Sequence, residues 1–173
     1  MPSFKYLART SIIAVKDEHR IVIGADSKVT LVGGPPDNII SSKIVQVGST
    51  FFALSGLAYE PSTRFNAYSI AAKSCQEGGS ILEKVERFES FVSARLVRTM
   101  EHVKEIKTEE YERSYGEECC LTIIFFGIEN DAPVIYMSNF EKTDDNDGSP
   151  VPIHSRPAGA GPLFRSRCGR AAC

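Results

Sequence analysis

Short apolar runs separated by polar turns open the sequence. The residues Ser11–Val15 and Ile21–Ala25 are mostly apolar, and the charged residues 16–20 lie between them. Two β-prone runs around a short polar turn predict a β-hairpin. Two more runs of this kind, Ile44–Val47 and Phe51–Leu54, predict a second pair of strands.

The periodicity changes after Pro61, where two helices are expected. Apolar residues within 65–76 fit helical spacing, and the glycine pair 78–79 ends that helix. Ser80 is followed three residues later by Glu83, which is the pattern of a capping box. A long second helix should therefore begin there.

The second helix has one apolar face and one charged face. Apolar residues recur along it at spacings of three and four: Leu82, Val85, Phe88, Val92, Leu96, Met100 and Val103. We expect this stripe to pack on a sheet. The charged residues near its start should face solvent: Glu83, Lys84, Glu86 and Arg87.

Strands return in the last third of the chain. Cys120–Phe126 and Val134–Met137 are apolar runs joined by the turn-like residues 129–131. Residues 165–173 have little periodicity and few apolar side chains, so they predict no element. The order of strands, two helices and strands indicates an α+β fold, and 173 residues suffice for one domain.

Composition excludes several classes of function. The net charge of −2 and a pI near 6.0 do not favour a nucleic-acid partner. No apolar run reaches the ~20 residues of a membrane span, and no secretory signal is recognised, so we expect a cytoplasmic protein, also nuclear if eukaryotic. The cysteines are best interpreted as free thiols of a reducing compartment: Cys75, Cys119, Cys120, Cys168 and Cys173. Neither their spacing with the histidines nor the acidic residues 144–148 fits a metal site.

Four residues lie at the ends of the predicted strands, and their combined spacing is more informative than any one of them. Thr10 opens the first predicted strand, Asp26 follows the second, Lys43 precedes the third and Gly56 follows the fourth. Taken singly, these are an ordinary strand residue, a turn former, a solvent-facing cation and a strand end. Together, and in this register, they resemble the signature of the proteasome β-type subunit family, a family of N-terminal-nucleophile hydrolases.

The resemblance covers residues 10–162 and implies a fold and an assembly. Members of the family are four-layer αββα sandwiches that form stacked rings around an enclosed chamber. Residues 1–9 would be a candidate propeptide, and residues 10–173 the N-terminal-nucleophile hydrolase domain with its C-terminal helices missing. The implied partners are homologous subunits and unfolded polypeptide substrate, with a regulatory ATPase as a further candidate. No metal or organic cofactor is implied.

The resemblance also assigns a role to each residue of the signature. Thr10 would be the nucleophile of a threonine endopeptidase, with its free α-amino group, whose reference pKa is ~7.7–8.0, as the base. Lys43 would place a positive charge beside this centre, and Asp26 would hold Lys43. The Gly56 N–H would donate to the developing oxyanion.

Three departures from the family pattern keep other functions open. Arg9 precedes Thr10, where the family commonly cleaves after glycine, and Thr10 has no α-amino group until residues 1–9 are removed. Ala160 stands where a serine is usual, and the chain ends at Cys173 before the family's last helices. The alternative function is a non-catalytic structural subunit or pseudoenzyme of the same fold. A more distant one is an amidohydrolase that acts on a small amide.

Overall fold

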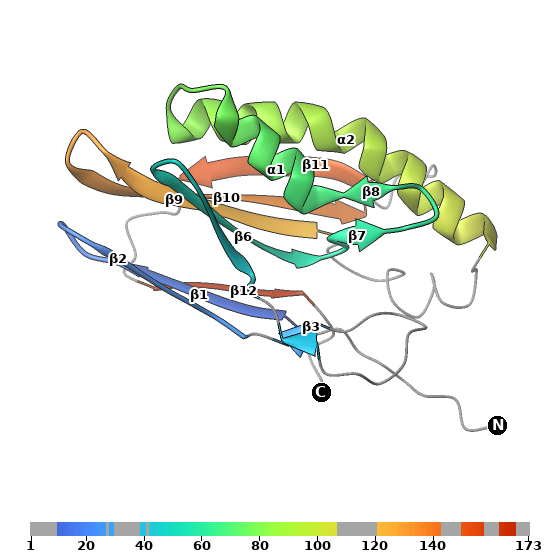
Figure 1. The fold of residues 1–173 in the computed structure, drawn as a ribbon, viewed down its shortest axis with the longest axis horizontal. Helices are drawn as coiled ribbons and strands as arrows, with labels where there is room; N and C mark the ends of the chain where they lie inside the picture. Colours follow the sequence, from blue (N-terminus) through green and yellow to red (C-terminus); the bar gives the residue numbers. More distant parts are fainter. Residues whose placement is uncertain are drawn as a thin grey trace.

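The computed structural model describes residues 10–26, 28–29, 39–40, 42–106, 121–142, 150–157 and 163–168. In these parts of the chain, two β-sheets stack on each other and two helices cover the outer face of the larger sheet, which gives an α+β fold (Figure 1). The elements are β1 (Thr10–Lys16), β2 (Ile21–Ala25), β3 (Lys28–Val29), β4 (Ile39–Ile40), β5 (Ile44–Val47), β6 (Thr50–Gly56), β7 (Tyr59–Glu60), β8 (Phe65–Asn66), α1 (Ala67–Gln76), α2 (Ile81–Ile106), β9 (Leu121–Glu129), β10 (Ala132–Lys142), β11 (Pro150–Pro157) and β12 (Leu163–Cys168).

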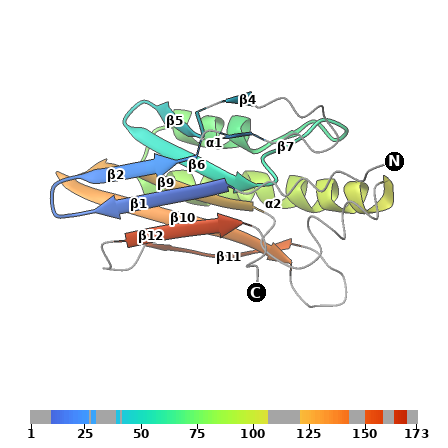
Figure 2. The same ribbon diagram turned by 90° about the horizontal axis from the view of Figure 1, so that it is seen from below.

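Both large sheets are antiparallel. The larger sheet has five strands in the order β11-β10-β9-β6-β5, and the smaller has three in the order β12-β1-β2. The two remaining pairs, β3-β4 and β7-β8, are short. Seen from below, the three-stranded sheet lies across the five-stranded one, with the helices behind both (Figure 2).

The helix boundaries have local causes. Asn66 caps α1, because its side chain accepts a hydrogen bond from the Ser69 N–H at 3.0 Å. At α2 the predicted capping box is confirmed: Glu83 N–H donates to Ser80 Oγ at 3.2 Å, and Ser80 N–H donates to Glu83 Oε2 at 2.7 Å. The first helix begins later than predicted, because Phe65 belongs to β8.

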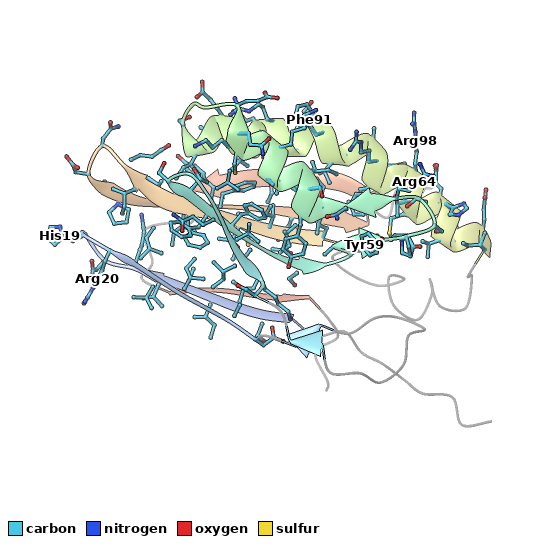
Figure 3. All side chains as sticks on the ribbon, in the orientation of Figure 1. His19, Arg20, Tyr59, Arg64, Phe91 and Arg98 are labelled. Carbon is cyan, nitrogen blue, oxygen red and sulfur yellow. The ribbon has the colours of Figure 1, made fainter. Side chains whose placement is uncertain are left out.

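The buried face of α2 differs from the predicted stripe at its first turn. Leu82 is 37% exposed, and Ile81 and Lys84 are buried in its place. The expectation that Lys84 faces solvent is therefore wrong. The Lys84 ammonium group donates a hydrogen bond to Thr50 Oγ1 at 2.7 Å. This bond makes the burial of a charged side chain possible, which the pattern of apolar residues does not predict. On the outer side of α2, Figure 3 shows Arg98 directed away from the sheet.

Two apolar clusters form the core, one on each side of the five-stranded sheet. The cluster beneath the helices includes Phe52, Leu54, Phe88 and Phe125, and Phe88 and Phe125 contact edge to face with ring centroids 5.6 Å apart. The cluster between the sheets is smaller: Ile12, Ala14, Ala53, Ile124, Phe126 and Ile135. Because side chains alternate along a strand, β6 and β9 each contribute to both clusters.

Several strands go beyond the prediction. β9 and β10 are longer than the runs that predicted them, and β11 and β12 were not predicted. The residues of β12 form a strand because they pair with β1, from Thr10↔Cys168 to Val15↔Leu163. That pairing is a long-range relationship that local periodicity does not reveal. None of the helices in the described parts of the chain is long and apolar enough to cross a membrane.

The β1–β2 hairpin is closed by a turn that its own sequence stabilises. Asp17 Oδ1 accepts hydrogen bonds from the main-chain N–H groups of His19 at 2.9 Å and Arg20 at 3.0 Å. The pKa of Asp17 is lowered most by the hydrogen bond from the His19 N–H. The Arg20 guanidinium and the Arg20 N–H lower it further. Figure 3 places His19 and Arg20 at the outer tip of this hairpin. The tip therefore sits at the end of the hairpin opposite Thr10 and Asp26.

Candidate functional site

The four signature positions lie at one end of the stacked sheets. Thr10 is the first residue of β1, and Asp26 directly follows β2. Lys43 directly precedes β5, and Gly56 is the last residue of β6. The start of β1 and the ends of β2 and β6 meet at the same end of the molecule in both ribbon views (Figures 1 and 2). The structure therefore brings together strand ends that are distant in sequence.

The hairpin register fixes Asp26 opposite Ser11. Ile12 pairs with Ala25, and one step further Asp26 N–H donates to Ser11 O at 3.1 Å. The Asp26 side chain then turns back, and its Oδ1 accepts the Ser11 N–H at 3.0 Å. The residue immediately after Thr10 is thus held by both main-chain and side-chain atoms of Asp26.

Lys43 links the two sheets at this end. Its Nζ donates to the same Asp26 Oδ1 at 2.8 Å, and the pair is a salt bridge. The Lys43 side chain is only 5% exposed, whereas that of Asp26 is 34% exposed. A buried ammonium requires a paired anion, because it loses its hydration on burial. Asp26 supplies that anion from the opposite sheet.

The main chain at Gly56 explains why glycine ends β6. Gly56 has φ of +96°, a conformation that side chains with a Cβ rarely adopt. Its Cα partner in β9 is Leu121. This conformation redirects the chain at the site, directly after the buried Ser55.

The negative charge of Asp26 also affects the pKa of Tyr68, a residue to which it is not hydrogen-bonded. Tyr68, on α1, lies partly buried against Phe52, with the two ring centroids 6.3 Å apart. Burial first, and then the negative charge of Asp26, raise the pKa of Tyr68 above the ordinary value of 10.0. Tyr68 is therefore a titrating group that responds to the charge at the site.

Thr10 is placed by its main chain. It opens β1 and pairs with Cys168 of β12, so the peptide that follows it is the one whose N–H is bound by Asp26. The side chain of Thr10 lies outside the described part of the structure, as do residues 1–9 and Ala160. The expectations about cleavage after Arg9 and about Ala160 therefore remain predictions.

Sequence reasoning missed the polar groups that surround the signature. Ser11 contributes a main-chain N–H, for which no residue type gives a signal. Ser55 is a buried hydroxyl beside Gly56, and the only sequence sign is a polar residue that follows an apolar strand. Thr122, its Cα partner in β9, donates a hydrogen bond to Asn139 Oδ1 at 2.9 Å.

A pocket of about 350 Å³ lies elsewhere, where β6 begins and α2 starts. Thr50, Lys84 and Glu129 contribute to its lining. The carboxylate of Glu129 accepts the Ile81 N–H, so this pocket lies against the first turn of α2. Among the described residues there is no cluster of histidine, cysteine and carboxylate side chains that could hold a metal ion.

At the signature positions, then, Asp26 joins the Lys43 ammonium to the start of the first strand, and the constrained Gly56 ends β6 at the same end of the stacked sheets (Figure 1). This arrangement holds the Lys43 ammonium near the Ser11 N–H and leaves the start of β1 at the end of the sheets. No protein-family model matches this chain, and a search of the curated proteins finds no match.

Proposed function

We propose that this chain is a proteasome-type subunit and a threonine endopeptidase, with Thr10 as its nucleophile once residues 1–9 have been removed. One observation carries the proposal: Asp26 Oδ1 accepts both the buried Lys43 ammonium at 2.8 Å and the Ser11 N–H at 3.0 Å. This places a fixed positive charge beside the first peptide of β1. The stacked sheets and the helical layer support an αββα sandwich as the complete fold.

The chemistry would use the strand end as follows. The hydroxyl of Thr10 attacks a peptide carbonyl, and its own freed α-amino group accepts the proton. Lys43 stabilises negative charge that develops on the threonine oxygen, and Asp26 keeps Lys43 in place. The N–H of Gly56 stabilises the oxyanion, a role whose removal typically lowers kcat about 10²–10³-fold. The tetrahedral intermediate collapses with cleavage of the C–N bond, and the departing amine takes the proton from the α-amino group. Water then hydrolyses the ester on Thr10, which releases the carboxylate product and the free hydroxyl.

The proposed setting is a ring-shaped complex in the cytoplasm. Homologous subunits are the partners, and unfolded polypeptide is the substrate. Confinement in a ring would restrict a threonine peptidase to chains that can enter the chamber. Native mass spectrometry of the Thr10→Ala variant tests this setting, because an inactive variant should still assemble. A species of single-chain mass under all conditions contradicts it.

A second function has one specific observation in its favour. Arg9 precedes Thr10, and a chain that keeps residues 1–9 has no α-amino base at the nucleophile. Such a chain would serve as a non-catalytic structural subunit with the same Asp26–Lys43 pair in a purely structural role. The two functions differ in one measurable property, the N-terminal residue of the mature protein.

The decisive experiment combines intact mass with peptide hydrolysis. N-terminal sequencing and mass should identify a chain that begins at Thr10, and this chain should hydrolyse unfolded polypeptides. Thr10→Ala should abolish hydrolysis, whereas Thr63→Ala, a threonine whose hydroxyl pairs with Thr99 at 3.0 Å, should keep it. Hydrolysis that survives in Thr10→Ala refutes the peptidase. A chain that stays uncleaved and inactive but enters a ring supports the structural subunit.

A further inference from the structure

Among the described residues, Ser55 is a buried polar group whose hydroxyl has no hydrogen-bond partner. It is 1% exposed, and its Oγ makes no hydrogen bond within the described residues. Its neighbours in β6, Ala53 and Leu54, are buried and apolar. An alanine would fill the same space without burying a hydroxyl, so an unpartnered serine here requires an explanation.

The side chain of Ser55 faces the space between the two sheets. Leu54 belongs to the cluster beneath the helices, and Ala53 belongs to the cluster between the sheets. Ser55 follows Ala53 by two residues and therefore lies on the same face of β6. It is next to Gly56, at the end of the sandwich where Asp26 and Lys43 meet.

A polar row crosses three strands at this level. Ser55 has Thr122 as its Cα partner, and Thr122 has Asn139 as its partner in β10. Thr122 donates its hydroxyl hydrogen to Asn139 Oδ1 at 2.9 Å. Directly opposite serine and threonine side chains in antiparallel strands are close enough to hydrogen-bond to each other, yet Ser55 Oγ makes no such bond within the described residues. A water molecule can connect polar groups that do not bond directly.

Lys43 enters the same space from the edge of the sheet. Ile44, which follows it, pairs with Ala53, so Lys43 and Ser55 lie at the same end of the β5–β6 hairpin. The Lys43 ammonium then reaches Asp26 on the other sheet. Buried waters satisfy buried hydroxyls that have no direct partner, and a lysine ammonium can donate to several acceptors at once.

We propose that Ser55 is a positioning residue for the Lys43–Asp26 pair: its hydroxyl holds an ordered water between the sheets, and this water connects the row of Ser55, Thr122 and Asn139 to Lys43. The water fixes the Lys43 side chain against Asp26 and keeps its charge beside the start of β1. The catalytic consequence rests on the proposed peptidase function, whereas the water and its effect on Lys43 do not.

The first test does not depend on activity. An atomic-resolution crystal structure of the wild-type protein should contain a water within hydrogen-bond distance of Ser55 Oγ, and one of Ser55→Ala should lack it. The NMR signal of the Lys43 side-chain ammonium should shift in Ser55→Ala. It should not shift in Ser74→Ala, which removes a buried hydroxyl that donates to Ala71 O at 2.8 Å. A Ser55 hydroxyl without a water, or a Lys43 signal equal in all three proteins, overturns the proposal.

The stability of Ser55→Ala against urea is a second test, because a bound water and an unpartnered hydroxyl predict changes of opposite sign. If Ser55 holds the water, Ser55→Ala should unfold at a lower urea concentration than the wild type. If the hydroxyl is simply unpartnered, Ser55→Ala should be as stable or more stable, and the proposal fails. Ser55→Cys, which is similar in size but a weak hydrogen-bond donor, should behave like Ser55→Ala.

The third test applies once peptidase activity is established. Ser55→Ala should lower kcat/KM about tenfold, as one lost positioning hydrogen bond does, and should alter the pH profile of kcat/KM. Ser74→Ala should change neither. Unaltered kcat/KM and pH profile in Ser55→Ala refute the catalytic role of Ser55 and leave the peptidase standing. If the wild type is inactive, the peptidase function is refuted. The crystallographic and NMR experiments then still test whether Ser55 binds the water.

Discussion

Asp26 binds Ser11 twice, because its N–H donates to Ser11 O at 3.1 Å and its Oδ1 accepts the Ser11 N–H at 3.0 Å. The same Oδ1 accepts from Lys43 Nζ at 2.8 Å. One oxygen atom therefore connects the first strand of the smaller sheet to a lysine beside the larger one. A substitution at Asp26 should disturb both the strand end and the contact between the sheets.

Asp26→Asn should destabilise the protein by about 1–3 kcal/mol, because it leaves the buried Lys43 ammonium without its anion. The value lies below that of a fully buried pair because the Asp26 side chain is 34% exposed. Urea unfolding of Asp26→Asn, Lys43→Met and the double variant should give a clearly non-additive cycle. Asp17→Asn, which removes an exposed pair with Arg20 and keeps an acceptor for the turn, should have a smaller effect than Asp26→Asn, and an equal loss there would contradict the assignment.

Ser80→Ala should destabilise the protein by about 1 kcal/mol through the loss of the cap of α2. The main-chain N–H of Ser80, and then its hydroxyl, lower the pKa of Glu83 below 4.5. A lowered folded-state pKa contributes stability above the unfolded value, and this contribution is lost as the pH falls through the folded value. The difference between the wild type and Ser80→Ala should therefore shrink in acid.

Urea unfolding at neutral and acidic pH measures this difference, and NMR titration of Glu83 should show its pKa rising toward 4.5 in Ser80→Ala. Ser93→Ala is the control, because the Ser93 hydroxyl donates to Glu89 O within the same helix and does not cap it. Alanine favours helix interiors, so Ser93→Ala should be neutral or slightly stabilising. A pKa of Glu83 that is unchanged in Ser80→Ala contradicts the capping box.

Gly127→Ala should destabilise the protein by about 1–3 kcal/mol, because a Cβ at this position would lie 2.9 Å from Ser49 O and 2.9 Å from Ile81 Cδ1. The Ser49 oxygen belongs to the main chain and cannot rotate away. Gly24→Ala is the matched strand glycine, since its Cβ would meet no atom within 4 Å, and it should be neutral or slightly stabilising. Thermal unfolding compares the two, and equal effects would contradict the close approach.

Asp26→Asn should also lower the pKa of Tyr68, because it removes the second of the two causes that raise it. Burial remains, so the pKa should stay above 10.0. A raised phenol pKa contributes stability below the unfolded value, and this is lost as the pH rises through the folded value. The stability that is lost as Tyr68 ionises should therefore be smaller in Asp26→Asn, and the loss should be complete at a lower pH. NMR titration of the Tyr68 ring measures the shift, and an identical titration in both proteins would show that Asp26 does not reach α1.

The sequence was most informative where local chemistry determines structure. The hairpin of β1 and β2, the capping box at Ser80 and the apolar stripe of α2 all rest on residues close together in sequence, and all were predicted. Lys84 and Leu82 exchanged places relative to expectation because a hydroxyl of β6, that of Thr50, satisfies the lysine. Such compensation depends on a partner from a distant strand, and periodicity contains no information about it.

The site shows the same division. The order of Thr10, Asp26, Lys43 and Gly56 along the strands follows from the sequence, and the resemblance made these four residues candidates. That Asp26 contacts the main chain of Ser11 follows only from the hairpin register. That the Ser55 hydroxyl has no partner within the described part of the chain also became visible only when the two sheets were stacked.

The pairing of β1 with β12 joins the beginning of the described chain to its end, from Thr10↔Cys168 onward. During synthesis on the ribosome, β1 and β2 emerge long before β12, which is the partner of β1 on its other edge. Until then one edge of β1 is open, and such edges are the contacts through which nascent chains aggregate. Because contacts between residues distant in sequence form slowly, the main-chain N–H groups of β1 that face β12 should become protected from hydrogen exchange later during refolding than those that face β2.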